Sequence, residues 1–231
     1  MHKLQYLTGG KPLAGGAAPG AGAGMGSDAT GKTAAGAGAS KALILLHGRG
    51  GSAEDILSLA DALPVNDFAL FAPQAKGNSW YPYSFLSPLE QNEPWLSGAL
   101  DVVKQLVAVV EEKGIAPEHI WFTGFSQGAC LMLEFLGRNA GRYGGAAAFT
   151  GGLIGDRIYP HHYHGDFRHT PIFIGTGNPD AHVPVQRVHD TTKLLKEMNA
   201  KVTEIVYPGM GHTVTGEEIK EAGRVAFGAS V

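Results

Sequence analysis

The fold prediction starts from one segment of the chain, Ile120-Trp121-Phe122-Thr123-Gly124-Phe125-Ser126-Gln127-Gly128. Its apolar, β-branched and aromatic beginning predicts a buried strand over Ile120–Phe125, and the Ala-, Leu- and Met-rich residues that follow predict a helix. A serine at a sharp strand-to-helix turn needs small residues two positions away on either side, and Gly124 and Gly128 supply them. The segment therefore predicts a turn that exposes Ser126.

From residue 41 onward, the chain alternates short apolar runs with longer amphipathic ones. This alternation predicts an α/β fold, in which a mostly parallel twisted sheet carries helices on both faces. Functional residues of such sheets gather in the loops after the carboxyl ends of the strands. We expect strands at Ala42–Leu46, Phe68–Ala72, Ile120–Phe125, Ala146–Thr150, Ile172–Gly175 and Val202–Val206. We expect helices at Ser52–Leu63, Leu96–Lys113, Gln127–Leu136, Val185–Asn199 and Gly216–Ala226, with a Pro- and Tyr-rich loop over residues 73–95.

The charge and composition exclude several classes of protein. The chain has 231 residues, with 18 Lys and Arg against 21 Asp and Glu, and so lacks the basic surplus of most proteins that bind nucleic acid or anionic membranes. Its apolar runs are far shorter than the about 20 residues that span a bilayer, which argues against integral membrane association. The single cysteine, Cys130, cannot form an internal disulfide, and this favours a reducing, cytoplasmic location.

The N-terminal part has a different composition. After an expected strand at residues 1–8, residues 9–40 contain 11 Gly and 10 Ala. Such a segment buries too little apolar surface to offset the entropy of ordering, so we expect a flexible, disordered insertion before a single catalytic domain at residues 41–231. Residues 26–33 match the phosphate-loop pattern, but low-complexity sequence replaces the strand that such a loop requires. We expect no nucleotide site there.

Ser126 requires a base, and the base requires an orienting carboxylate, because a serine hydroxyl is a poor nucleophile at neutral pH. On this kind of sheet the partners follow in the order Ser, Asp or Glu, His, each just after a strand. Asp180 follows the expected strand that ends at Gly175, and His212 follows the one that ends at Val206. We favour Asp180 and His212 over their competitors, which are His182, His189, Asp156 and Asp166.

An acyl-transfer site also needs two N–H donors for the developing oxyanion. One should be the backbone N–H of Gln127, which follows the serine, and we expect the other from Arg49 in the loop after the first strand of the α/β domain. We interpret His47, at the start of that loop, as a structural residue. The aromatic loop and the segment after Asp180 predict a substrate-binding wall formed by Trp80, Tyr81, Phe85 and Val183.

Four histidines between His161 and His169 raise the question of a metal site. Two ligands are best set on one face of a helix, whereas Pro, Gly and Tyr surround these histidines. We interpret this stretch as a surface loop and expect no metal.

Four motifs together resemble the phospholipase/carboxylesterase family of the α/β-hydrolases, which includes the acyl-protein thioesterases. They are Leu46-His47-Gly48-Arg49-Gly50-Gly51, Gly124-Phe125-Ser126-Gln127-Gly128, Asp180-Ala181-His182-Val183-Pro184 and Pro208-Gly209-Met210-Gly211-His212. The resemblance covers residues 41–227 and 7–13. It implies Ser126 as nucleophile with Asp180 and His212 as partners, Arg49 and Gln127 as oxyanion donors, and no cofactor. Residues 80–85 and 163–167 resemble the bacterial small-ester branch more than the protein-depalmitoylating branch.

The sequence therefore predicts a serine esterase that hydrolyses small, short-chain carboxylic esters through an acyl-enzyme. One alternative is a thioesterase or lysophospholipase for long acyl chains, and another is a non-catalytic protein of the same fold that only binds a ligand. The expected partner is a small-molecule ester, with no nucleic acid. Whether the protein forms a homodimer stays open.

Overall fold

The computed structural model describes residues 4–13 and 38–228. The phosphate-loop match at residues 26–33 and most of the expected insertion at residues 9–40 lie outside the described residues. The two described ends of the insertion meet, because Leu13 and Ala39 form a parallel bridge and the Ala39 N–H donates to the Pro12 carbonyl at 2.7 Å. Within the described residues no helix is long and apolar enough to cross a membrane.

The described residues form one seven-stranded sheet in the order β1-β3-β2-β4-β5-β6-β7. Only the pairing of β1 with β3 is antiparallel, which confirms the expected mostly parallel sheet. The last two strands extend two to three residues further than the sequence predicted, because they stay paired as far as Asn178 and Pro208. The strands are β1 (Tyr6–Gly10), β2 (Lys41–Leu46), β3 (Phe68–Pro73), β4 (Ile120–Phe125), β5 (Gly145–Phe149), β6 (Pro171–Asn178) and β7 (Lys201–Pro208).

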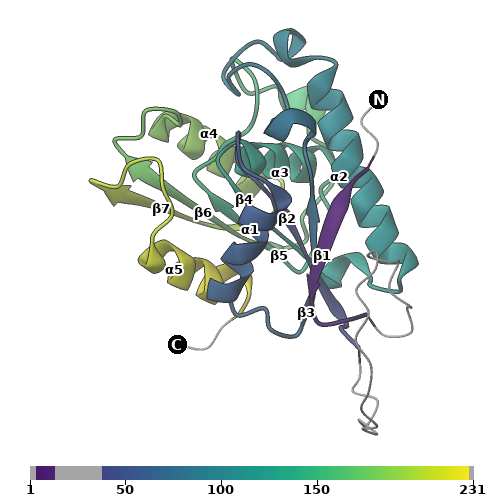
Figure 1. Ribbon diagram of the computed structural model, residues 1–231. Helices are drawn as coiled ribbons and strands as arrows, with labels where there is room; N and C mark the ends of the chain where they lie inside the picture. Colours follow the sequence, from purple (N-terminus) through teal and green to yellow (C-terminus); the bar gives the residue numbers. More distant parts are fainter. Residues whose placement is uncertain (1–3, 14–37, 229–231) are drawn as a thin grey trace, which may run out of the picture.

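Helices cover both faces of the sheet, as expected. In Figure 1, α1 and α5 lie on the near face and α2, α3 and α4 lie behind it. Each face has its own buried apolar cluster, and the sheet separates the two clusters. The helices are α1 (Ala53–Leu57), α2 (Trp95–Glu112), α3 (Gln127–Arg138), α4 (Val185–Glu197) and α5 (Gly216–Ala226).

The first of the expected helices is shorter than the sequence predicted. The capping box of Ser52 and Asp55 starts α1, but α1 ends at Leu57 and continues only as a 3-10 turn over Ser58–Ala62. Leu63 then adopts an extended conformation, with φ −101° and ψ 153°. The reason is Pro64, because a residue before proline is disfavoured in the helical region.

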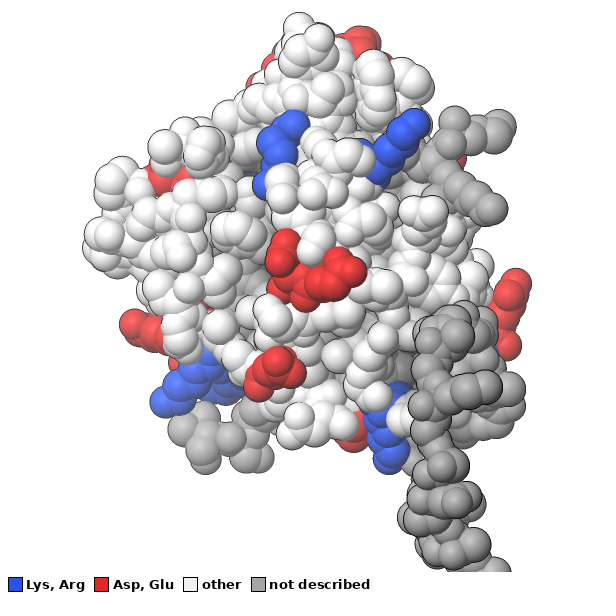
Figure 2. Space-filling model, viewed as in Figure 1, with Lys and Arg blue, Asp and Glu red and all other residues white. Residues whose placement is uncertain are grey.

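The surface carries few charges on the face that α1 and α5 cover. Figure 2 shows a small acidic group over α1 and scattered basic side chains. Glu54 and Asp55 lie in the first turn of α1, where acidic side chains interact favourably with the positive end of a helix.

The turn from β4 to α3 is possible only because two glycines lie against each other and against β2. A Cβ on Gly124 would lie 2.7 Å from the Gly128 carbonyl carbon. A Cβ on Gly128 would lie 2.6 Å from the His47 carbonyl oxygen and would also overlap the carbonyl of Leu46. All of these neighbours are backbone atoms, which cannot move aside without displacing β2 or α3.

Replacing Gly128 by Ala should therefore lower the free energy of unfolding by about 3 kcal/mol, because the new methyl group overpacks backbone. Urea denaturation of both proteins measures the difference. Gly216→Ala is the matched control, since a Cβ there would meet nothing within 4 Å and Ala favours a helix start. Equal stability of Gly128→Ala and the wild type would contradict the packing described.

A buried carboxyl joins α5 to the sheet. Glu218 has no exposed surface, and its side chain packs where a Cβ on Gly175 of β6 would otherwise lie. Its Oε2 accepts the Thr215 N–H at 3.4 Å in a capping box, whereas Oε1 is buried without a partner among the described residues. Burial raises the pKa of Glu218 to about 7, although the bond from Thr215 opposes this shift.

The raised pKa predicts that Glu218 makes folding pH-dependent. Below about pH 4.5 the carboxyl is protonated in both folded and unfolded chains; above it the unfolded chain ionises first, and stability falls until about pH 7. Glu218→Gln should remove this loss, so that its stability relative to the wild type rises by about 2–3 kcal/mol between pH 5 and pH 8. Exposed Glu217→Gln is the control. A relative stability that stays constant over this range would contradict the assignment.

Candidate active site

Ser126 occupies the turn between β4 and α3 in a strained conformation, with φ 53° and ψ −118°. This region is sparsely populated by residues other than glycine, and strain of this kind persists only where surrounding contacts enforce it. Two backbone bonds do so: the Ser126 N–H donates to the Phe149 carbonyl at 3.0 Å, and the Cys130 N–H donates to the Ser126 carbonyl at 3.0 Å. The side chain is thereby turned away from the helix and into a pocket.

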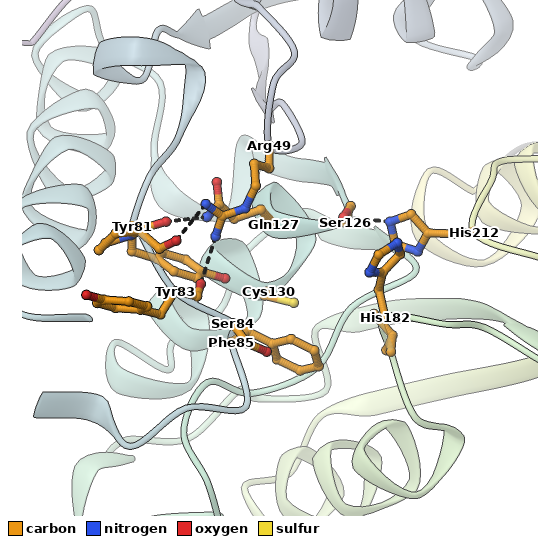
Figure 3. A pocket seen from close by; sticks show the side chains of 12 residues that line it. Arg49, Tyr81, Tyr83, Ser84, Phe85, Ser126, Gln127, Cys130, His182 and His212 are labelled. Atoms are coloured by element: carbon orange, nitrogen blue, oxygen red, sulfur yellow. Dashed lines mark hydrogen bonds between the residues drawn. The ribbon is translucent and has the colours of Figure 1, made fainter. Parts of the chain in front are cut away.

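The structure brings together the three residues that the sequence predicted as a unit. His212 Nε2 lies 2.8 Å from Ser126 Oγ, and His212 Nδ1 lies 2.8 Å from Asp180 Oδ2 (Figure 3 shows the first contact). Because a carboxylate only accepts hydrogen bonds, the Nδ1–H of His212 donates to Asp180, and Nε2 is free to accept the Ser126 hydroxyl proton. Hydroxyl, imidazole and carboxylate therefore form one continuous proton path.

Asp180 is held in place independently of His212. Its Oδ1 accepts the backbone N–H groups of His182 at 2.7 Å and Val183 at 2.9 Å, and its side chain is fully buried. Burial alone would raise the pKa of Asp180, but these two bonds and the His212 imidazole together outweigh burial and lower it. Asp180 is therefore an ionised acceptor at neutral pH.

Asp180 follows β6 and His212 follows β7. Their loops lie close enough for the two side chains to meet because β6 and β7 stay paired to their ends. The Gly209 N–H donates to the Asn178 carbonyl at 2.7 Å, beyond the carboxyl ends of the central strands. A Cβ on Gly177 would lie 2.6 Å from the Gly211 carbonyl oxygen, so only glycine permits this close approach. His212 also packs against Phe125 of β4, with ring centroids 5.3 Å apart.

Arg49 lies in the loop after β2, whereas Gln127 directly follows Ser126. Gln127 is the first residue of α3, where a helix leaves its N–H without an intrahelical partner. Arg49 follows Gly48, and a Cβ on Gly48 would lie 3.5 Å from the Cβ of Ser126. The loop that carries Arg49 therefore lies directly beside Ser126. Neither backbone N–H donates to another group within residues 4–13 and 38–228.

His47 is a structural residue, in agreement with the sequence interpretation. It is buried; its Nδ1–H donates to the Gly48 carbonyl at 2.7 Å, and its Nε2 accepts the Ala75 N–H at 3.1 Å. Burial lowers the pKa of His47, although its bond to Gly48 opposes this. Both ring nitrogens are thus engaged with backbone.

The pocket beside Ser126 has a volume of about 570 Å³. Three of the four expected wall residues line it, namely Tyr81, Phe85 and Val183. Cys130, one helical turn after Ser126, and His182 line it as well, although neither was expected there. Spacing of four residues on a helix could have indicated Cys130. The lining consists of Arg49, Tyr81, Pro82, Tyr83, Ser84, Phe85, Ser126, Gln127, Cys130, His182, Val183 and His212.

The expectation for Trp80 was wrong, because Trp80 does not line this pocket. Its indole is 3% exposed, packs 4.9 Å from the His47 ring and donates from Nε1 to the His47 carbonyl at 2.8 Å. Trp80 therefore packs against His47 and stabilises the start of the loop that carries Arg49. Burial raises the pKa of the Cys130 thiol to about 12, so this thiol is protonated at neutral pH.

The competing residues lie elsewhere or have other partners. Asp156 accepts a hydrogen bond from Tyr159, and Asp166 accepts one from Asn199, both on the surface. His189 of α4 is paired with Glu204 of β7 at 2.5 Å. The ring of His182 lies beside that of His212, with centroids 4.7 Å apart. The backbone N–H of His182 donates a hydrogen bond to Asp180 Oδ1.

The histidines between His161 and His169 do not assemble a metal site. Within the described part of the chain, no group of three or more His, Cys, Asp or Glu side chains is arranged to hold a metal ion. His162 instead stacks on Tyr159 with ring centroids 5.4 Å apart.

Comparisons with known proteins agree with the fold. A family model described as Phospholipase/Carboxylesterase matches residues 33–224. Acyl-protein thioesterase 1 of Saccharomyces cerevisiae is 28% identical over 210 residues, which cover 79% of this chain and 90% of that protein. Carboxylesterase SOBER1 of Arabidopsis thaliana is 24% identical over 200 residues, covering 77% and 86%. A crystal structure of a phospholipase/carboxylesterase from Dyadobacter fermentans is 48% identical, with a TM-score of 0.85 and 96% of each chain covered.

Proposed function

The chain belongs to the phospholipase/carboxylesterase family of α/β-hydrolases and is a carboxylic ester hydrolase, and we propose that it cleaves small, short-chain esters through a Ser126–His212–Asp180 acyl-enzyme mechanism. The observation that carries the mechanism is the pair of 2.8 Å contacts that link these three side chains. An intact proton path of this kind also argues against a protein that only binds its ligand.

Acylation begins when Ser126 Oγ attacks the ester carbonyl carbon while His212 Nε2 takes the hydroxyl proton. The carbonyl π-electrons move to the oxygen and form a tetrahedral oxyanion. The C–O bond to the alcohol then breaks, and the proton on His212 passes to the leaving alcohol. Asp180 keeps Nδ1 protonated throughout and stabilises the transient imidazolium. Water repeats the sequence on the acyl-enzyme, which releases the acid and restores Ser126.

The backbone N–H groups of Arg49 and Gln127 are the proposed oxyanion donors. Both belong to residues that line the pocket beside Ser126, and both N–H groups lack a partner among the described residues. Donors fixed before the reaction stabilise the charge where it develops, and this is the largest single contribution in many acyl-transfer enzymes.

The proposed substrate size rests on the wall of the pocket. Tyr81 is almost fully buried and Phe85 is buried, so that two large rings limit the space beside the nucleophile. We also propose that residues 41–231 form the catalytic domain and that an insertion separates β1 from β2. Gly9 and Gly10 of the expected insertion belong to β1, so this insertion begins after Gly10. A cytoplasmic location remains our expectation, since the single thiol is free and buried.

Replacing Ser126 by Ala should lower kcat/KM for p-nitrophenyl butyrate by about 10⁴-fold or more, because no other group can form the acyl-enzyme. The same variant should no longer be labelled by a fluorophosphonate, as intact-mass spectrometry would show. Ser97→Ala, which changes an exposed serine on α2, is the control and should keep full activity. Labelling that persists in Ser126→Ala would reject Ser126 as the nucleophile.

The second candidate is hydrolysis of long-chain thioesters or lysophospholipids, which the similarity to an acyl-protein thioesterase favours. A series of p-nitrophenyl esters from acetate to palmitate separates the two. We expect kcat/KM to be highest at about two to six acyl carbons and to fall about tenfold by ten carbons, because the rings of Tyr81 and Phe85 limit the space beside the nucleophile. An optimum above about ten carbons would favour the second candidate.

A further inference from the structure

The side chain of Arg49 is directed to one short segment of the pocket wall. Its Nη1 donates to Ser79 Oγ at 3.0 Å and to the Pro82 carbonyl at 2.9 Å, and its Nη2 donates to the Tyr83 carbonyl at 2.7 Å. Figure 3 shows the guanidinium group reaching the tyrosine side of the pocket, away from His212. Bonds from a charged donor are about twice as strong as neutral ones, and the planar guanidinium fixes their directions.

The side chain of Gln127 at the start of α3 binds the same segment of the pocket wall. Its Oε1 accepts the Trp80 N–H at 3.0 Å, and its Nε2 donates to the Tyr81 carbonyl at 2.8 Å. Gln127 and both of its partners are buried. The two residues whose backbone N–H groups are the proposed oxyanion donors are therefore both tied, through their side chains, to residues 79–83.

Ser79 joins the two sets of bonds. Its Oγ accepts from Arg49 Nη1 at 3.0 Å and from Gln127 Nε2 at 3.4 Å, and it donates to the Tyr81 carbonyl at 2.9 Å. Ser79 is not among the residues that line the pocket, so its hydroxyl serves other protein groups.

Two further bonds fasten the loop that carries Arg49. The Gly50 N–H donates to the Asn78 carbonyl at 2.7 Å, and Trp80 Nε1 donates to the His47 carbonyl at 2.8 Å. Residues on both sides of Arg49 are thus held by the same stretch of wall. A shift of that stretch would move the Arg49 N–H with it.

We propose that Arg49, Ser79 and Gln127 form a hydrogen-bonded brace, in which Ser79 is a positioning residue that sets the spacing between the two oxyanion donors. This inference rests on the proposed function of the site. Oxyanion donors act at about 2.7–3.1 Å, and a displacement of about 1 Å near a reacting group can lower the rate about 100-fold. The brace therefore acts on the transition state, with little effect on binding of the ground-state ester.

Ser79→Ala tests the brace because it deletes one hydroxyl outside the pocket. With p-nitrophenyl butyrate, kcat should fall about tenfold while KM changes by less than about twofold. Affinity for a trifluoromethyl ketone, whose hemiketal oxyanion would occupy the same position as that of the ester, should fall by a similar factor. Ser79→Thr, which keeps the hydroxyl, should retain kcat to within about threefold. Ser97→Ala on α2 is the control.

A folded Ser79→Ala protein with unchanged kcat and unchanged affinity for the ketone would overturn the proposal, as would a rise in KM alone. If Ser79→Ala does not fold, Arg49→Lys provides the same test, because lysine keeps the backbone N–H and the charge but cannot reach three acceptors. A wild-type protein that hydrolyses no ester, or hydrolysis that survives Ser126→Ala, would count against the proposed function rather than the brace.

Discussion

The close approach of β4, α3 and β2 around two glycines is the constraint on which the site depends. Gly124 and Gly128 contact each other, and Gly128 contacts the carbonyls at the end of β2, so that the chain between them has no room for a relaxed turn. Ser126 consequently takes a conformation with positive φ, and its hydroxyl projects into the pocket. The same approach brings the loop after β2 against Ser126, so that Arg49 and Gln127 both line the pocket beside it.

The rest of the site is delivered by the two outermost strands on one side of the sheet. Because β6 and β7 stay paired to Asn178 and Pro208, the loops that follow them start side by side. Asp180 is fixed by backbone N–H groups of its own loop, and His212 completes the line to Ser126. The reactive geometry is therefore set by strand pairing and tight glycine contacts rather than by flexible side chains.

The sequence predicted those parts that depend on local pattern. Apolar runs predicted the central strands. The rule that functional residues follow strands favoured Asp180 and His212 over candidates closer to Ser126 in the sequence, such as His182. The brace could not be predicted, because its bonds join residues far apart in sequence and many end on backbone carbonyls, which no residue type reveals. The position of Trp80 differs from the prediction for another reason. An aromatic residue in a loop can line a pocket or pack in the interior, and its residue type does not distinguish the two. The end of α1 depends on a single residue, Pro64, which disfavours a helical conformation at Leu63 even though the apolar pattern continues to that residue.

We infer that Ser126 attacks an ester carbonyl whose oxygen then binds the N–H groups of Arg49 and Gln127. A crystal structure of the protein after reaction with an alkyl fluorophosphonate tests this most directly, because the tetrahedral phosphorus imitates the reacting carbon. We expect phosphorus bonded to Ser126 Oγ, with the phosphoryl oxygen about 3 Å from both N–H groups. Phosphorus on another residue, or a phosphoryl oxygen directed away from both donors, would contradict it.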